Sequence, residues 1–430
     1  MTNLAWNVER VLPSAIADLH RLISIPSISS MPEHDADVAA CADAVSGLFR
    51  DLGASEVKLL DGGGKPAVWA NFPGPEGTPT VLLYAHYDVQ PTGDTDAWTS
   101  PAFEPTERDG RLYARGSADD KGGVALHVAA LRVFDGKPPV GVKVFIEGEE
   151  EVGSPSMPTL LDRYRDELAA DVYVVADSVN WEVGKPSLTT SLRGVADCQV
   201  TVSTLAEGLH SGQFGGVVPD ALTALCRLLA TLHDDAGNVA IEGLVTGTAP
   251  DLDYPEDRLL EETGLLEGVS QIGDGSVVER MWFKPAASVL AIDATPVAKA
   301  SNTLIPSARA KVSVRLVPGQ DPAAAAKALE EHLRRNAPWG AHVDVVAGQC
   351  GAPGRITLEG ERAEAAKTAF REAFGVDAVE IGCGGSIPIV AEFADRNPEA
   401  LVLVTAVTDP NSRMHGIDES LDLGDFAKAA

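Results

Sequence analysis

Short apolar runs alternate with helical patterns over residues 68–178, and this alternation limits the folds open to the chain. The runs that predict strands are VWANF (68–72), VLLYAHYDV (81–89), VKVFIEG (142–148) and DVYVVADS (171–178). The segment KGGVALHVAALRVF, between the second and third runs, repeats apolar residues at helical spacing. Strands that alternate with helices are typical of an α/β sandwich whose sheet is largely parallel and covered by helices on both faces.

A second pattern begins near residue 190, with three strands of alternating polar and apolar residues and two helices. These segments are 192–205, 219–233, 308–319, 323–337 and 342–348. The order strand, helix, strand, helix, strand predicts a smaller α+β domain inserted into the larger one. We therefore expect one α/β domain formed by residues 1–189 and 355–430, and a second domain over residues 190–354.

Charge and cysteine content narrow the function. The 430-residue chain has 34 basic and 63 acidic residues, a formal net charge of −29. Nucleic acid and anionic membrane surfaces repel so acidic a protein, so neither is an expected partner. The five cysteines are scattered and form no CxxC pair, which favours a reducing compartment. The N-terminal segment predicts an amphipathic helix and not a signal peptide, so the expected location is cytoplasmic.

Four glutamates crowd the end of one predicted strand, in FIEGEEEVGSP (145–155). Charged strand ends are common, and a solvated loop is the simpler interpretation. The alternative is a site whose chemistry requires negative charge. The side chains that follow the neighbouring strands decide between the two.

Groups that bind metals follow three of the predicted strands. They are His86 and Asp88 after the second run, Glu150 and Glu151 after the third, and Asp177 after the fourth. Ligands of an open α/β sheet bind at the carboxyl ends of its strands. We therefore expect these side chains to gather at one edge of the sheet.

Two more groups are expected at the same edge: Asp119 and Asp120, which precede a helix, and His415, which follows the strand-like run LVLVTAV. Each group also has an ordinary explanation, such as a helix N-cap for the aspartate pair or an exposed loop for the histidine. Several coincidences at matching strand ends are harder to accept than one site. Imidazole together with carboxylates suits Zn²⁺ or Mn²⁺.

Six motifs together resemble the dinuclear zinc metallopeptidases. They are HYDVQP (86–91), RGSADDKGG (115–123), EGEEEVGS (147–154), LHSGQFGG (209–216), GGSIP (384–388) and RMHG (413–416). The family includes carnosine-type dipeptidases, acetylornithine deacetylase, succinyl-diaminopimelate desuccinylase and glutamate carboxypeptidase. The resemblance implies that the α/β domain is catalytic, that the inserted domain is a lid and dimerisation domain, and that the protein is a homodimer.

The resemblance also implies two divalent metal ions per chain, with zinc expected first and manganese or cobalt also compatible with the ligands. The ligands that it implies for one ion are His86, Asp119 and Asp177. Those for the other ion are Asp119, Glu151 and His415, so Asp119 bridges the two.

Further roles at the metals follow from the same resemblance. Asp88 would accept the second N–H of the His86 imidazole. Glu150 would be the general base, taking a proton from the metal-bridging water and passing it to the leaving nitrogen. The peptide bond between Asp119 and Asp120 would be cis.

The resemblance places His210 in the active site of the partner subunit, where it would stabilise the oxyanion of the tetrahedral intermediate. The residues that it implies for substrate binding are Asn302, Thr303, Arg315, Gly385 and Ser386. Without the resemblance, His210 is equally a loop histidine and Arg315 equally a solvent-facing strand residue. An acid often precedes GGSIP in dipeptidases that bind a free amino terminus. Here Cys383 stands at that position, which leaves recognition of the amine open.

The expected function is metal-dependent hydrolysis of the amide bond of dipeptides or similar small peptides. The alternative within the family is a deacylase of N-acyl amino acids. A rival of another class is a non-catalytic metal-binding or scaffold protein on the same fold. The apparent completeness of the ligand set, with Glu150 and Asp88 beside it, favours an enzyme.

Overall fold

The computed structural model describes residues 4–385 and 387–430. The chain forms two compact units, each built from separate stretches of sequence. The larger unit contains Met1–Thr190, Ile356–Ile381 and Pro388–Ala430. The smaller unit contains Ser191–Arg355 and Gly382–Ile387.

A six-stranded sheet forms the centre of the larger unit, in the order β1-β2-β6-β3-β7-β17. Its strands are β1 (Glu56–Leu60), β2 (Ala67–Phe72), β3 (Thr80–His86), β6 (Gly141–Glu147), β7 (Val172–Val175) and β17 (Leu401–Val404). The four strands from β6 to β17 are mutually parallel, whereas β1 and β2 pair antiparallel at one side. The expectation of a largely parallel sheet is confirmed.

Consecutive residues of β3 show how helices cover both faces, because neighbouring side chains on a strand point in opposite directions. Ala85 packs in a buried cluster with residues of α2 (Asp35–Asp51) and α3 (Lys121–Val133). The ring of Tyr84 instead meets the ring of Phe393, on α11 (Pro388–Arg396), with 6.5 Å between their centroids. Helices therefore cover both faces of the sheet, which gives the expected α/β sandwich.

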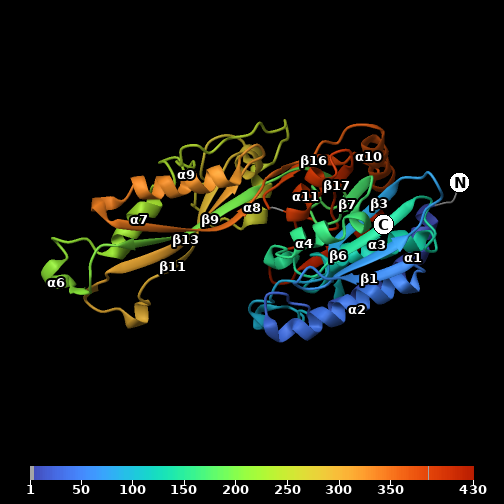
Figure 1. The fold of residues 1–430 in the computed structure, drawn as a ribbon, viewed down its shortest axis with the longest axis horizontal. Coiled ribbons are helices and arrows are strands. Elements are labelled where there is room, and N and C mark those ends of the chain that lie inside the picture. The colour runs from blue at the N-terminus through green and yellow to red at the C-terminus, as the bar shows by residue number, and fades with distance from the viewer. Residues whose placement is uncertain (1–3, 386) are drawn as a thin grey trace. The chain divides into compact units, whose positions relative to one another are not determined.

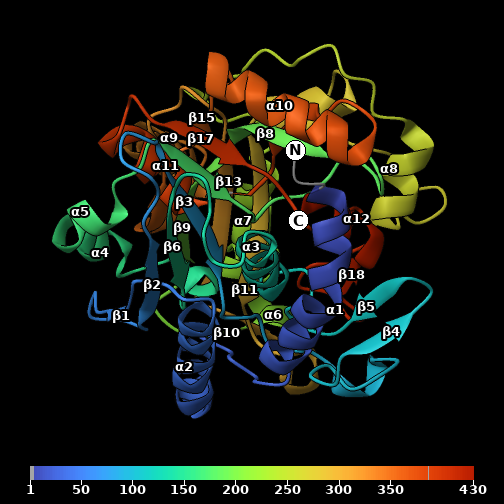
Figure 2. The ribbon, with the colours of Figure 1, turned by 90° about the vertical axis from the view of Figure 1, so that its right-hand side faces the viewer.

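Outside α3, the N- and C-terminal helices form a further layer (Figures 1 and 2). Helix α1 (Leu4–Ile23) and helix α12 (Leu423–Ala429) contribute Leu19 and Phe426 to a buried cluster that also contains Ala125 of α3. This layer fixes one side of the helix that begins at the predicted metal site.

Nine further helices and strands lie outside the six-stranded sheet. They are β4 (Thr106–Arg108), β5 (Arg111–Tyr113), α4 (Met157–Arg163), α5 (Arg165–Leu168), β8 (Ser187–Leu192), β15 (Gly354–Arg355), α10 (Glu361–Phe374), β16 (Val379–Cys383) and β18 (Ser420–Asp422). Helices α4 and α5 are separate, because Tyr164 between them leaves helical geometry at φ −114° and ψ 37°. No helix in the described part of the chain combines the length and apolar character needed to cross a bilayer.

The smaller unit contains a four-stranded antiparallel sheet in the order β11-β13-β9-β14. Its strands are β9 (Gly194–Ser203), β11 (Ala286–Asp293), β13 (Ser307–Leu316) and β14 (His342–Gly351). Helices α7 (Ala221–Ala230) and α9 (Pro322–Arg335) bury their apolar residues against one face (Figure 1). Strand β11 was not predicted from the sequence, and it forms an edge with exposed Val289, Leu290 and Ile292.

Four further short elements lie in the smaller unit, and one of them, β10, ends in the predicted residue His210. They are β10 (Leu209–His210), α6 (Ser211–Phe214), α8 (Glu256–Thr263) and β12 (Thr303–Leu304). Strands β10 and β12 pair antiparallel, with His210 opposite Thr303.

Candidate metal centre

Three neighbouring parallel strands end where the predicted ligands lie. His86 is the last residue of β3, and Asp177 follows the last residue of β7 by two positions. Glu150 and Glu151 begin the short 3-10 turn that follows β6. The carboxyl ends of these strands thus carry the side chains that the sequence predicted for this edge.

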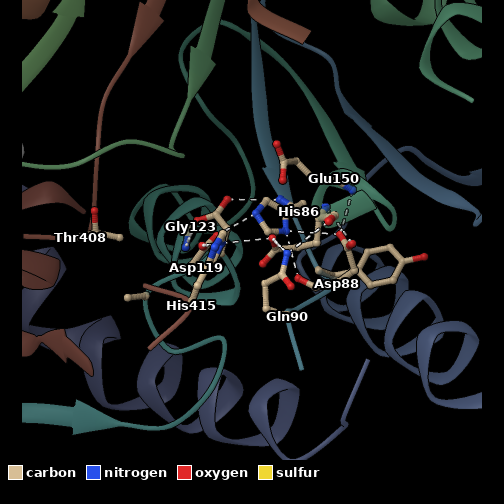
Figure 3. A network of polar contacts seen from close by, with 12 residues as sticks. His86, Asp88, Gln90, Asp119, Gly123, Glu150, Thr408 and His415 are labelled. Atoms are coloured by element: carbon tan, nitrogen blue, oxygen red, sulfur yellow. Dashed lines mark hydrogen bonds and ion pairs between the residues drawn. The ribbon is translucent and has the colours of Figure 1, made fainter. Parts of the chain in front are cut away.

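Asp119 lies between two histidines and presents one carboxylate oxygen to each (Figure 3). Its Oδ1 is 3.0 Å from Nε2 of His86, and its Oδ2 is 3.0 Å from Nε2 of His415. Although burial opposes the charge, hydrogen bonds from His415 and His86 hold the pKa of Asp119 below its usual range. A carboxylate with one oxygen facing each of two imidazoles has the arrangement that a bridging ligand requires.

Glu151 joins the same group from the turn after β6. Its Oε2 is 3.2 Å from Nε2 of His415, and Nε2 of Gln90 donates to this oxygen over 2.8 Å. Ligand atoms of His86, Asp119 and Glu151 all lie within 4.8 Å of one another. Gln90 was not singled out from the sequence, although it lies within the HYDVQP motif.

A second group brings His86 together with Asp177 and Asp120, whose ligand atoms also lie within 4.8 Å of one another. Asp120 is already engaged: its Oδ1 accepts the N–H of Gly123 at the start of α3, and its Oδ2 accepts the N–H of His86. The N-cap explanation therefore describes Asp120 correctly. The peptide bond between Asp119 and Asp120 is cis, as expected.

Asp88 is fully buried and contacts both the imidazole and the glutamate turn. The closer acceptor for Nδ1 of His86 is the Asp88 carbonyl oxygen, at 3.0 Å, while the carboxylate Oδ1 is 3.4 Å away. The two carboxylate oxygens accept the backbone N–H groups of Glu150 and Glu151, over 3.2 and 3.1 Å. Asp88 therefore holds the turn that carries both glutamates, in addition to facing the imidazole.

The glutamate run is not a solvated loop. Glu147 is 1% exposed and Glu149 is 4% exposed. Glu149 accepts the N–H groups of Lys65 and Ser156, so it fastens the turn to two neighbouring segments. The hydroxyl of Tyr84 donates to Glu147, and burial raises the pKa of Glu147 to about 8.

Negative charge is concentrated at this edge and is only partly offset. Burial raises the pKa of Glu150 to about 7 despite the attraction of His86, and the neighbouring carboxylates add to the shift. Burial also raises the pKa of Asp177 well above its usual range. Oxygen and imidazole donors in a buried, acidic cluster fit divalent cations such as Zn²⁺ or Mn²⁺. His86, Asp119, Glu151, Asp177 and His415 would hold them.

In the smaller unit, the predicted residues His210, Asn302 and Thr303 lie close together. Pairing of β10 with β12 brings His210 beside Thr303, and the N–H of Ser211 donates to the carbonyl of Asn302 over 2.9 Å. Nδ1 of His210 accepts the N–H of Gly212 over 3.1 Å. With Nδ1 as an acceptor, the neutral ring carries its proton on Nε2, where it can serve as a donor.

Two other predicted substrate-binding residues, Arg315 and Gly385, lie on other segments of the smaller unit. Arg315 is on β13, opposite Val195 of β9. Gly385 follows β16, and an added Cβ there would lie 3.8 Å from Sγ of Cys383. Ser386 lies outside the described residues.

Comparisons with known proteins found a matching family model and similar proteins over nearly the whole chain. The model of the family described as Peptidase family M20/M25/M40 matches residues 82–430. The cysteinylglycine-S-conjugate dipeptidase of Corynebacterium striatum is 36% identical over 427 residues, which are 98% of this chain and 93% of that protein. The beta-Ala-His dipeptidase of Rattus norvegicus is 29% identical over 89% of this chain and 83% of that protein.

Among solved structures, the di-peptidase Dug1p of Saccharomyces cerevisiae superposes with a TM-score of 0.86 at 25% identity, covering 100% of this chain and 96% of that one. Such coverage extends through both units, including the segments that join them. The length of the family match and the level of identity place this chain in the M20/M25/M40 family of peptidases.

Proposed function

We propose that this protein is a metal-dependent dipeptidase. The observation that carries the proposal is the convergence of two histidines and three carboxylates at one sheet edge, with Glu150 beside them. Relatives named as dipeptidases match nearly the whole chain, which supports dipeptides over N-acyl amino acids as substrates. The deacylase remains the alternative.

We propose two ions per chain, held by His86, Asp119 and Asp177 on one side and by Asp119, Glu151 and His415 on the other. When bound, such ions polarise the scissile carbonyl and make water acidic enough to lose a proton near neutral pH. Zn²⁺ is the first choice, and Mn²⁺ and Co²⁺ suit the same ligands.

Glu150 is the general base of this proposal. The carboxylate of Asp88 accepts the Glu150 N–H and so fixes the direction in which its side chain leaves the turn. In the reaction, Glu150 takes a proton from the attacking water and donates it to the leaving nitrogen as the amide bond breaks. The fixed backbone holds Glu150 in position for both transfers.

Residues of the smaller unit would bind the substrate. Arg315 lies near enough to Arg193 to repel it electrostatically, and burial with this repulsion lowers the pKa of Arg193 to about 10. Two neighbouring guanidinium groups favour an anion, so we propose that Arg315 binds the substrate carboxylate through a bidentate contact. Asn302, Thr303 and Gly385 would supply further polar contacts.

We also propose a homodimer in which His210 acts on the substrate of the partner subunit. The smaller unit offers an unpaired edge at β11, with apolar side chains exposed along it, and such an edge favours pairing with another strand. The Nε2–H of His210 is the donor suited to the oxyanion. The larger unit would then be the catalytic domain, and the smaller unit a lid and dimerisation domain.

A cytoplasmic setting is proposed as well. All five cysteines are free thiols, two of them exposed, and thiols persist in reducing compartments.

Purified protein should hydrolyse dipeptides and leave N-acetyl and N-succinyl amino acids intact. The measurement is amine release from a panel of both substrate types, before chelation, after chelation, and after Zn²⁺ or Mn²⁺ is restored. Activity should disappear with the metal and return with it. Cleavage of acyl amino acids alone would indicate that the protein is a deacylase. Metal binding without turnover of any substrate would favour the non-catalytic rival.

Substitution of Glu150→Gln should lower kcat by roughly 10²- to 10⁴-fold, the usual contribution of a general base, while metal content is retained. The change keeps the size and the backbone contacts of residue 150. Glu76→Gln, the same chemical change at an exposed position in the same unit, is the matched control and should be fully active. Wild-type kcat in Glu150→Gln would contradict the mechanism.

Metal stoichiometry should follow the proposed ligand sets. Wild-type protein is expected to bind about two ions per chain, and Asp177→Ala about one, because each ion has a ligand of its own besides the shared Asp119. Elemental analysis after equilibrium dialysis measures both values. If Asp177→Ala retains both ions at full affinity, this residue is not a ligand.

Mixed dimers test the role of His210. Chains carrying Glu150→Gln or His210→Ala should each form inactive homodimers. In a mixed dimer, one active site receives both intact residues if His210 acts across the interface. Co-expressed, doubly tagged heterodimers should thus recover about half of the wild-type activity, since one of two equivalent sites is complete. An inactive heterodimer would place His210 in its own subunit's site, whereas an active His210→Ala homodimer would place it outside catalysis.

A further inference from the structure

A buried ion pair lies behind the proposed ligands. Arg115 and Glu419 are 1% and 0% exposed, and Nη1 of Arg115 is 2.6 Å from Oε2 of Glu419. Removing two charges from water is costly. A protein is often as stable, or more stable, when apolar residues of similar size replace a buried ion pair. A pair of this kind calls for an explanation beyond stability.

Glu419 supports the backbone that carries Asp119. Its second oxygen, Oε1, accepts the N–H of Ala118 over 3.0 Å and the N–H of Asp119 over 3.1 Å. Asp119 is the residue whose two carboxylate oxygens face His86 and His415. The position of the Asp119 carboxylate therefore depends on the Glu419 carboxylate, which is itself held by Arg115.

Arg115 reaches two other segments of the site with its Nη2. This atom donates to the carbonyl of Gly416 and to the carbonyl of Pro91, each over 3.1 Å. Gly416 directly follows His415. Pro91 directly follows Gln90, whose side chain donates to Glu151. One guanidinium group thus joins the loops that carry or support these ligands.

We infer that Arg115 and Glu419 are positioning residues that set the spacing of Asp119 and His415, and through it the affinity for the metal ions. This inference rests on the metal-dependent function proposed above. Both residues hydrogen-bond to backbone groups of Asp119 or of residues close to the proposed ligands. Second-layer contacts of this kind commonly change metal affinity by 10- to 100-fold.

The test compares metal affinity with stability in matched variants. Glu419→Gln keeps the shape of the side chain but places an amide against Arg115, so the affinity of at least one ion should fall roughly 10- to 100-fold. The control is Asp18→Asn, which breaks the partly buried Arg132–Asp18 pair between α1 and α3 in the same unit. This control should lower the melting temperature and leave metal affinity unchanged.

A double variant, Arg115→Met with Glu419→Gln, removes both charges and guards against misfolding of the single variant. It too should bind metal more weakly. Competition with a chromophoric chelator gives the affinity, and circular dichroism gives the folded fraction and melting temperature. Wild-type affinity in both variants, with only a lower melting temperature, would overturn the inference. Failure of the wild-type protein to bind metal would overturn the proposed function as well, so the two failures are distinguishable.

Discussion

Mutual repulsion among buried carboxylates at the carboxyl edge of the six-stranded sheet is the constraint on which the rest of the structure depends. Burial raises the pKa of both Glu150 and Asp177 because an isolated charge is costly there. Such a cluster persists only where hydrogen-bond donors and cations offset it. Because β3, β6 and β7 are parallel, their carboxyl ends meet at one edge and bring these carboxylates together. The same convergence suits the binding of cations.

Seven of the acids around this edge divide into two kinds, according to what their oxygens contact. In the first kind, both carboxylate oxygens accept hydrogen bonds from fixed groups of the protein, chiefly backbone N–H groups. Its members are Asp88, Asp120, Glu149 and Glu419. The other kind faces imidazoles or other carboxylates; its members are Asp119, Glu151 and Asp177. The first kind holds the second in place, so rigidity and chemistry come from the same residue type.

Periodicity and motif order predicted the sandwich, the inserted unit and the edge at which the proposed ligands meet. They could not predict β11, because its outward residues are apolar and exposed, which removes the alternation that marks a half-buried strand. The position of the Asp88 side chain was predicted, but its principal contacts were not. Hydrogen bonds to backbone groups depend on the path of the chain after the strand ends, and side-chain spacing does not record that path. Arg115 and Glu419 were missed for the same reason, since 304 residues separate them.

The run from Glu147 to Glu151 shows the limit of prediction from residue type. Glu147 still belongs to β6 and meets the hydroxyl of Tyr84 inside the sheet layer. Two residues later the chain turns, and Glu149 points back to the backbone of two other segments. Only Glu150 and Glu151 remain at the edge, with their N–H groups held by Asp88. The backbone changes direction within these five residues, and chemically identical side chains therefore have different contacts and different roles. Because these contacts differ, replacing Glu149 would act through the position of the turn, whereas replacing Glu150 would act on the proton transfer proposed for it.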